Sequence, residues 1–192
     1  MTYCTAIDLV MGYYSMKLDE SVKKYCVIVL PWGKYVYNCL PMGLKISSDV
    51  FQRELGNLFS DCPFVLVYID DILILSKGSY ENHLEQIEIV LERLLKKGMQ
   101  VHAIKSIFAA AETEYLGYML TREGVKPQAS KIKAILNIAV PETVRQLRGF
   151  VGIVNFYRDM WPKRAETMKP LTDLINKKRE KYSGQKRPKR PS

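Results

Sequence analysis

The stretch FVLVYIDDILILS, residues 64–76, is apolar except for its last serine and the adjacent acids Asp70 and Asp71. Its length and its β-branched residues predict two buried strands that fold back on each other at the acidic pair. A buried carboxylate without a partner loses several kcal/mol or more of hydration free energy. The pair therefore either faces solvent at an ordinary hairpin tip or has its charge compensated.

A third acid stands near the end of another short apolar run. Residues 5–9 predict a strand, and Asp8 is followed by a glycine and two tyrosines that indicate a turn. Mg²⁺ prefers carboxylate oxygens, and two ions about 3.5–4 Å apart would use Asp8 as a third ligand beside Asp70 and Asp71. The three acids are thus candidate metal ligands.

Strand and helix patterns surround these acids. Residues 25–40 contain two β-rich runs around a Pro-Trp-Gly loop, which predicts a hairpin. Residues 47–59 have apolar positions at helical spacing, and the candidate N-cap residues are Ser47, Ser48 and Asp49. Residues 81–97 predict an amphipathic helix that Gly98 ends. Its predicted apolar positions are Leu84, Ile87, Leu91 and Leu94.

The second part of the chain changes character. Short β-rich pieces are predicted at residues 99–102 and 114–120, followed by a turn at Glu123 and Gly124. Helical patterns then cover residues 128–138, 142–155 and 163–176, separated by prolines. The sequence therefore predicts a mixed domain over residues 1–125 and a small helical subdomain over residues 126–176.

Charge is concentrated at the C-terminal end. Residues 177–192 hold eight Lys or Arg against one Glu, a net charge of +7, which leaves +2 of the total +9 for the rest of the chain. This basic, proline-containing tail is predicted to be disordered. It is either a solvated end, a nucleic-acid contact or a nuclear import signal.

Composition excludes several classes of protein. The 192 residues contain no run of 18 apolar residues and no signal peptide pattern, so we expect an intracellular protein, cytoplasmic or nuclear, without a membrane partner. The four cysteines form no Cys-x-x-Cys pair, which argues against zinc and disulfide frameworks.

Six segments in order resemble the reverse transcriptases of Ty3/gypsy-type long-terminal-repeat retrotransposons. TAIDLVMGYY is similar to their first catalytic motif, VYIDDILILS to their Tyr-x-Asp-Asp motif, and YLGYML to their primer-grip hairpin. The other segments are LPMGLKISSDVFQ, HLEQIEIVLERL with KSIF, and TVRQLRGFVGIVNFYR. The resemblance covers about residues 2–176 and implies an α+β fold, the right-hand polymerase palm. In that fold an antiparallel sheet is backed by helices, here with partial fingers and a small helical thumb.

The resemblance also implies roles for single residues. Asp8, Asp70 and Asp71 would hold two Mg²⁺ ions, or Mn²⁺ in their place, and Lys105 would stand near the leaving pyrophosphate. Tyr13 matches the steric gate that selects deoxynucleotides, although core packing is an alternative reading of this ring. The remaining matches are Met42, Gly43 and Gln52 for the nucleotide side, Leu116 and Gly117 for the primer grip, and Arg145, Arg148 and Arg158 for phosphate contacts.

The implied activity is templated transfer of deoxynucleotides to a primer 3′-hydroxyl on an RNA or DNA template, as part of retrotransposon replication. Two alternatives remain: a catalytically silent remnant that only binds nucleic acid, and an interaction domain with an incidental Asp-Asp turn. Seven residues precede Asp8, fewer than the basic fingers of the family need. We therefore expect the isolated chain to bind primer–template and to extend it near background.

Overall fold

The computed structural model describes residues 1–183, and within them the chain forms two compact units. The first unit comprises residues 1–115 and 119–125. Of the described residues, the second comprises 116–118 and 126–183. Among the described residues, no helix is both long and apolar enough to cross a membrane.

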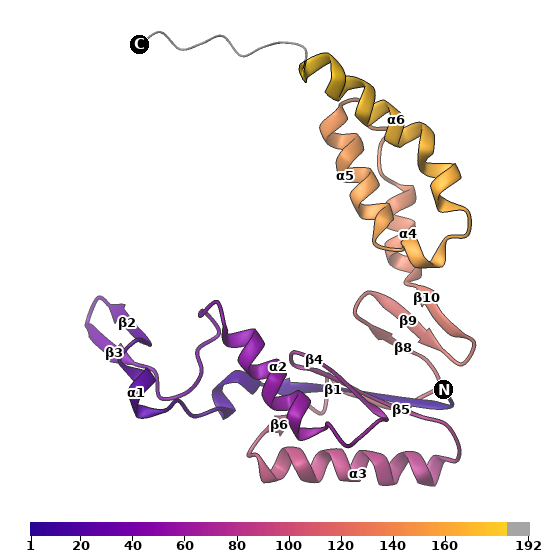
Figure 1. Ribbon diagram of the computed structural model, residues 1–192. Coiled ribbons are helices and arrows are strands. Elements are labelled where there is room, and N and C mark those ends of the chain that lie inside the picture. Colours follow the sequence, from indigo (N-terminus) through magenta and orange to yellow (C-terminus); the bar gives the residue numbers. More distant parts are fainter. Residues whose placement is uncertain (184–192) are drawn as a thin grey trace, which may run out of the picture. The chain divides into compact units, whose positions relative to one another are not determined.

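The first unit is built on a five-stranded sheet whose central strand is β1 (Tyr3–Val10). On one side β1 pairs antiparallel with β5 (Asp71–Ser76), which in turn pairs with β4 (Val65–Tyr68). On the other side β1 pairs with β6 (Gln100–Val101) and β7 (Ile107–Ala110). The predicted hairpin at residues 64–76 is therefore confirmed, and β1 lies beside it (Figure 1).

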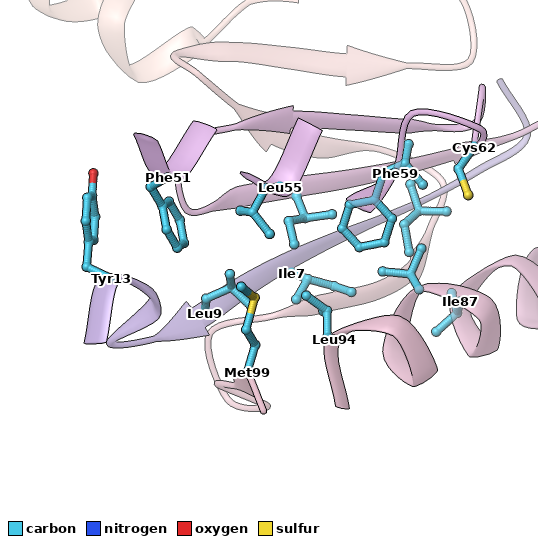
Figure 2. Packing of buried hydrophobic residues seen from close by; sticks show 14 of the residues in the cluster. Ile7, Leu9, Tyr13, Phe51, Leu55, Phe59, Cys62, Ile87, Leu94 and Met99 are labelled. Atoms are coloured by element: carbon cyan, nitrogen blue, oxygen red, sulfur yellow. The ribbon is translucent and has the colours of Figure 1, made fainter. Parts of the chain in front are cut away.

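Two helices cover one face of this sheet, and the core lies between them and the strands. They are α2 (Ser47–Leu58) and α3 (Tyr80–Lys96). Figure 2 shows Ile7 and Leu9 of β1 pointing at Leu55 of α2 and Leu94 of α3. Successive side chains of a strand point to opposite faces, so the positions next to Ile7 point away from the helices.

The remaining elements lie around this core or belong to the helical part. After β1 come η1 (Gly12–Ser15), α1 (Glu20–Lys23), and the hairpin of β2 (Val27–Leu30) and β3 (Gly33–Val36). A three-stranded sheet has the order β10 (Gly124–Pro127), β9 (Tyr118–Thr121), β8 (Thr113–Tyr115). The helical elements are α4 (Ala129–Leu136), α5 (Val144–Asn155), η2 (Arg158–Met160) and α6 (Arg164–Ser183).

Three details of the sequence prediction are wrong. Strand β4 is not buried on both faces: it is an edge strand with Leu66 and Tyr68 half-exposed. No side chain caps α2, because Ser47 lies inside the helix and its hydroxyl donates to the Pro41 carbonyl at 2.5 Å. The strand β7 was not expected at all, because IFAA is short and lacks alternation.

The predicted apolar stripe of α3 is also rotated in the structure. Leu84 is 44% exposed, whereas His83 and Val90 are buried together with Ile87 and Leu94. His83 can be buried because its Nε2 forms a hydrogen bond of 2.9 Å with Thr5 Oγ1 and its ring stacks on Tyr3. His83 is thus buried because it has a hydrogen-bond partner, although the apolar spacing predicts that its neighbour Leu84 is the buried residue.

The end of the chain departs from prediction in part. Helix α6 continues to Ser183, so the first seven residues of the predicted tail, 177–183, are helical. The other residues of that tail, 184–192, lie outside the described part of the chain.

The buried face of α3 can be tested with a matched control. Leu94→Ala removes a side chain that is 1% exposed and should lower the free energy of unfolding by about 2–5 kcal/mol. Leu84→Ala on the same helix should change it by less than about 1 kcal/mol, because that side chain is 44% exposed. Urea unfolding of both variants measures this, and equal losses would contradict the observed orientation of α3.

Candidate active site

The sheet brings two of the three candidate acids directly opposite each other. Asp8 and Asp71 are the last register partners of the β1–β5 ladder. The preceding pair, Ile7 and Ile72, is buried in the core, so alternation puts both carboxylates on the face away from α2 and α3. Side chains paired across antiparallel strands have Cβ atoms only about 4.5–5.5 Å apart, and like charges so placed repel.

The third acid lies in the turn between β4 and β5. Ile69 and Asp70 form this turn, and Ile69 has a φ of 56°. A left-handed backbone is unusual for a β-branched residue, costs about 1–3 kcal/mol and persists only where its surroundings determine it. The turn that carries Asp70 is therefore held in a strained conformation.

Gln52 of α2 holds this turn with both ends of its amide. The backbone N–H of Ile69 donates to Gln52 Oε1 at 2.6 Å, and Gln52 Nε2 donates to the Val67 carbonyl at 3.0 Å. The side chain expected to face the nucleotide is thus engaged with the backbone next to Asp70. Its nucleotide contact stays a prediction.

A second set of hydrogen bonds fixes the backbone of Asp8. Its N–H donates to Ser106 Oγ at 3.1 Å, and its carbonyl accepts from the His102 N–H at 2.8 Å. Ser106 Oγ in turn donates to the His102 carbonyl at 2.9 Å. Lys105 lies exposed in the same loop, so the loop that fixes Asp8 also carries the candidate lysine.

Negative charge accumulates where these elements meet. Desolvation, followed by the charges of Asp70 and Asp8, raises the pKa of Asp71 above its usual value. Desolvation and the nearby groups Asp71 and Tyr68 raise the pKa of Tyr115 to about 12. Tyr115 was not anticipated from the sequence, and only its place immediately before Leu116 could have indicated it.

The acids suit a hard divalent cation in chemistry but do not form a finished ligand cage. Carboxylate oxygens that repel one another are stabilised by a cation, and after desolvation this repulsion is the second cause of the raised pKa of Asp71. Within residues 1–183, however, no three His, Cys, Asp or Glu side chains stand close enough together to hold a metal ion. The strand register and the charges that act on Asp71 nevertheless place the three acids in one neighbourhood.

Of the other predicted residues, Tyr13, Met42 and Gly43 belong to the first unit. Tyr13 is only 8% exposed, its ring stacks on Phe51 with centroids 4.6 Å apart, and its hydroxyl donates to Ser48 at 3.2 Å. Figure 2 shows this ring at the end of the core. Met42 and Gly43 are exposed in the loop before α2.

The predicted primer-grip and phosphate-binding residues belong to the second unit. Leu116 and Gly117 form the left-handed turn before β9, with φ values of 48° and 81°. Arg145 and Arg148 are exposed, one turn apart on α5, and Arg158 is exposed in η2 next to Asp159.

The fold is that of a nucleic-acid polymerase palm: an antiparallel sheet with helices on one face and paired acids at the strand ends. A family model described as reverse transcriptase (RNA-dependent DNA polymerase) matches residues 1–120. This chain belongs to the reverse transcriptase family.

Individual relatives agree with this assignment. The chain is 33% identical over 186 residues to the retrovirus-related Pol polyprotein from transposon 297 of Drosophila melanogaster, covering 96% of this chain and 17% of that protein. It is 34% identical to the Pro-Pol polyprotein of simian foamy virus type 3, covering 94% of this chain and 16% of the relative. The chain thus spans about a sixth of the length of these relatives.

Solved structures resemble it as well. The foamy viral protease-reverse transcriptase in complex with double-stranded DNA superimposes with a TM-score of 0.85 at 29% identity, covering 92% of this chain and 31% of that one. The same enzyme in complex with an RNA/DNA hybrid gives a TM-score of 0.78 at 29% identity, over 92% of this chain and 24% of that one.

The acidic neighbourhood predicts a dependence of stability on pH. Because the pKa of Asp71 is raised in the folded chain, folding favours its protonated form. That contribution is present below the unfolded pKa of about 3.9 and is lost as the pH rises through the folded value. At pH 7 without divalent ions, Asp71→Asn should therefore raise the melting temperature, and the difference should shrink toward pH 3.

Thermal unfolding at several pH values measures this effect. Asp173→Asn is the control, because this carboxylate is exposed on α6. A lower melting temperature for Asp71→Asn at pH 7 would contradict this prediction, because it would mean that the charged carboxylate stabilises the folded chain.

Proposed function

We propose that this chain is the palm and thumb part of an RNA-directed DNA polymerase that transfers deoxynucleotides to a primer 3′-hydroxyl. The observation that carries the proposal is the register pair Asp8–Asp71 beside the Asp70 turn, within a chain of the reverse transcriptase family. The reaction belongs to retrotransposon replication, since the relatives include transposon polyproteins.

The chain's own residues would act mainly by positioning. Asp8, Asp70 and Asp71 would hold two divalent ions, and Gln52 and Ser106 would keep the turn and strand that carry them from shifting. When bound, such ions would lower the pKa of the primer hydroxyl and neutralise charge on the departing pyrophosphate. Lys105, exposed in the loop that fixes Asp8, would add a positive charge near that leaving group.

Primer–template is the proposed partner, with deoxynucleoside triphosphates as substrates. The support is the exposure of Arg145 and Arg148 on one face of α5, together with similar structures that contain double-stranded DNA or an RNA/DNA hybrid. Exposed arginines contact phosphates without reading sequence. Binding should therefore weaken as the salt concentration rises.

The test is primer extension by a chimera. Residues 1–176 replace the matching segment of the foamy viral protease-reverse transcriptase, and Mg²⁺-dependent extension of a DNA primer on an RNA template is measured. Asp71→Asn should lower the rate by about a thousandfold or more, because several kcal/mol of transition-state stabilisation are lost. Asp173→Asn should leave the rate unchanged.

The outcomes separate the proposal from its rival. A folded chimera that binds primer–template but adds no nucleotide would support a silent remnant. Extension that is equally fast with Asn at position 71 would remove this acid from the reaction.

The proposed steric gate needs a separate measurement. Tyr13 packs on Phe51, so Tyr13→Ala should lower the free energy of unfolding by about 3–5 kcal/mol. If the ring also limits the space for a 2′-hydroxyl, the same change should raise the incorporation of ribonucleotides relative to deoxynucleotides in the chimera. Loss of stability with unchanged sugar selectivity would leave this ring with a packing role alone.

A further inference from the structure

The turn that joins β8 to β9 is attached to α5 by two reciprocal hydrogen bonds. Tyr157, just past the end of α5, donates its hydroxyl to the Gly117 carbonyl at 3.2 Å. Tyr118 donates its hydroxyl to the Phe156 carbonyl at 3.1 Å. Each segment thus supplies one donor and one acceptor to the other.

Three aromatic rings pack around these bonds. Tyr118 and Phe156 stack with centroids 5.1 Å apart and planes 14° apart. Tyr157 meets Phe156 edge-on at 4.9 Å and Tyr118 edge-on at 5.7 Å. Such pairs prefer stacked or edge-to-face geometry, so the observed arrangement of the three rings is a favourable one.

The turn itself needs an external constraint. Leu116 has a φ of 48° and Gly117 a φ of 81°, so two consecutive residues are left-handed and the first carries a side chain. A backbone of this kind persists only where its surroundings determine it. A Cβ at Gly117 would lie 3.4 Å from the Phe156 ring, at van der Waals contact, so this ring lies beside the turn.

Packing does not confine Tyr157 on every side. Its ring borders an apolar pocket of about 460 Å³ that Gly117, Ile135, Ile153 and Phe156 also line. The ring could swing into this space if its hydroxyl were not engaged. Burial and the neighbouring Tyr118 raise the pKa of Tyr157, so the hydroxyl remains a donor well above neutral pH.

We propose that Tyr157 is a positioning residue that holds the Leu116–Gly117 turn on α5 through its hydroxyl. Residues 116–118 accordingly group with the helical unit and not with the sheet that carries the acids. This step rests on the proposed function, in which the Leu116–Gly117 turn contacts the primer end. The position of that turn would then depend on the position of α5. Tyr157 would then set where the primer end lies without touching the reacting atoms.

The first experiment needs no activity. Hydrogen–deuterium exchange is measured on the full chain and on Tyr157→Phe, which keeps the ring and removes the hydroxyl. Exchange in a peptide spanning residues 113–121 should become faster, while a peptide spanning β5 should not change. Tyr25→Phe is the control, because Tyr25 is 74% exposed in the first unit. Unchanged exchange at residues 113–121 would overturn the proposal.

The second experiment uses the chimera. Tyr157→Phe should raise the KM for primer–template by roughly two- to tenfold, the effect of losing one hydrogen bond, with kcat within about twofold. A two- to tenfold fall in kcat with an unchanged KM would overturn the positioning role. If exchange accelerates but no chimera extends a primer, the attachment of the turn by Tyr157 is supported and only the proposed function fails.

Discussion

The antiparallel pairing of β1 with β5 is the constraint on which the rest of the structure depends. This ladder sets Ile7 against Ile72 on the face covered by the helices, and one step further it sets Asp8 against Asp71 on the opposite face. Because the side-chain period of a strand is two, a slip of one residue would bury the acids and expose the isoleucines. The same hydrophobic burial that stabilises the sheet therefore fixes the relative position of the two carboxylates.

This arrangement concentrates like charge, and the surrounding hydrogen bonds resist its effect. Gln52 holds the Asp70 turn from α2, and Ser106 together with His102 holds the backbone of Asp8. Both sets of bonds act on backbone atoms and leave the carboxylate oxygens available. A site assembled in this way is rigid in its main chain while its acids can still turn toward a cation.

Much of this could be predicted from the sequence, because the apolar runs are bounded by acids and turns. The pairing of residues 64–76 as a hairpin, the helix before it and the ending of α3 at Gly98 all follow from local pattern. The burial of His83 and the exposure of Leu84 do not, because they depend on Thr5 and Tyr3, which lie far away in the sequence. The role of Gln52 and the attachment of Gly117 to Tyr157 are likewise tertiary, and no local spacing encodes them.

Backbone strain marks the same segments as the candidate chemistry. Three of the non-glycine residues with positive φ are Met11 after β1, Ile69 beside the acidic pair, and Leu116 at the proposed primer grip. Each stands directly after a strand: Met11 after β1, Ile69 after β4 and Leu116 after β8. A strained residue lowers stability and persists only where its surroundings determine it. The Gln52 amide of α2 holds Ile69, and the Tyr157 hydroxyl just past α5 holds the Leu116–Gly117 turn at the Gly117 carbonyl. In the first unit α2, and in the second unit the segment just past α5, thus supply a polar contact that keeps a strained turn in place.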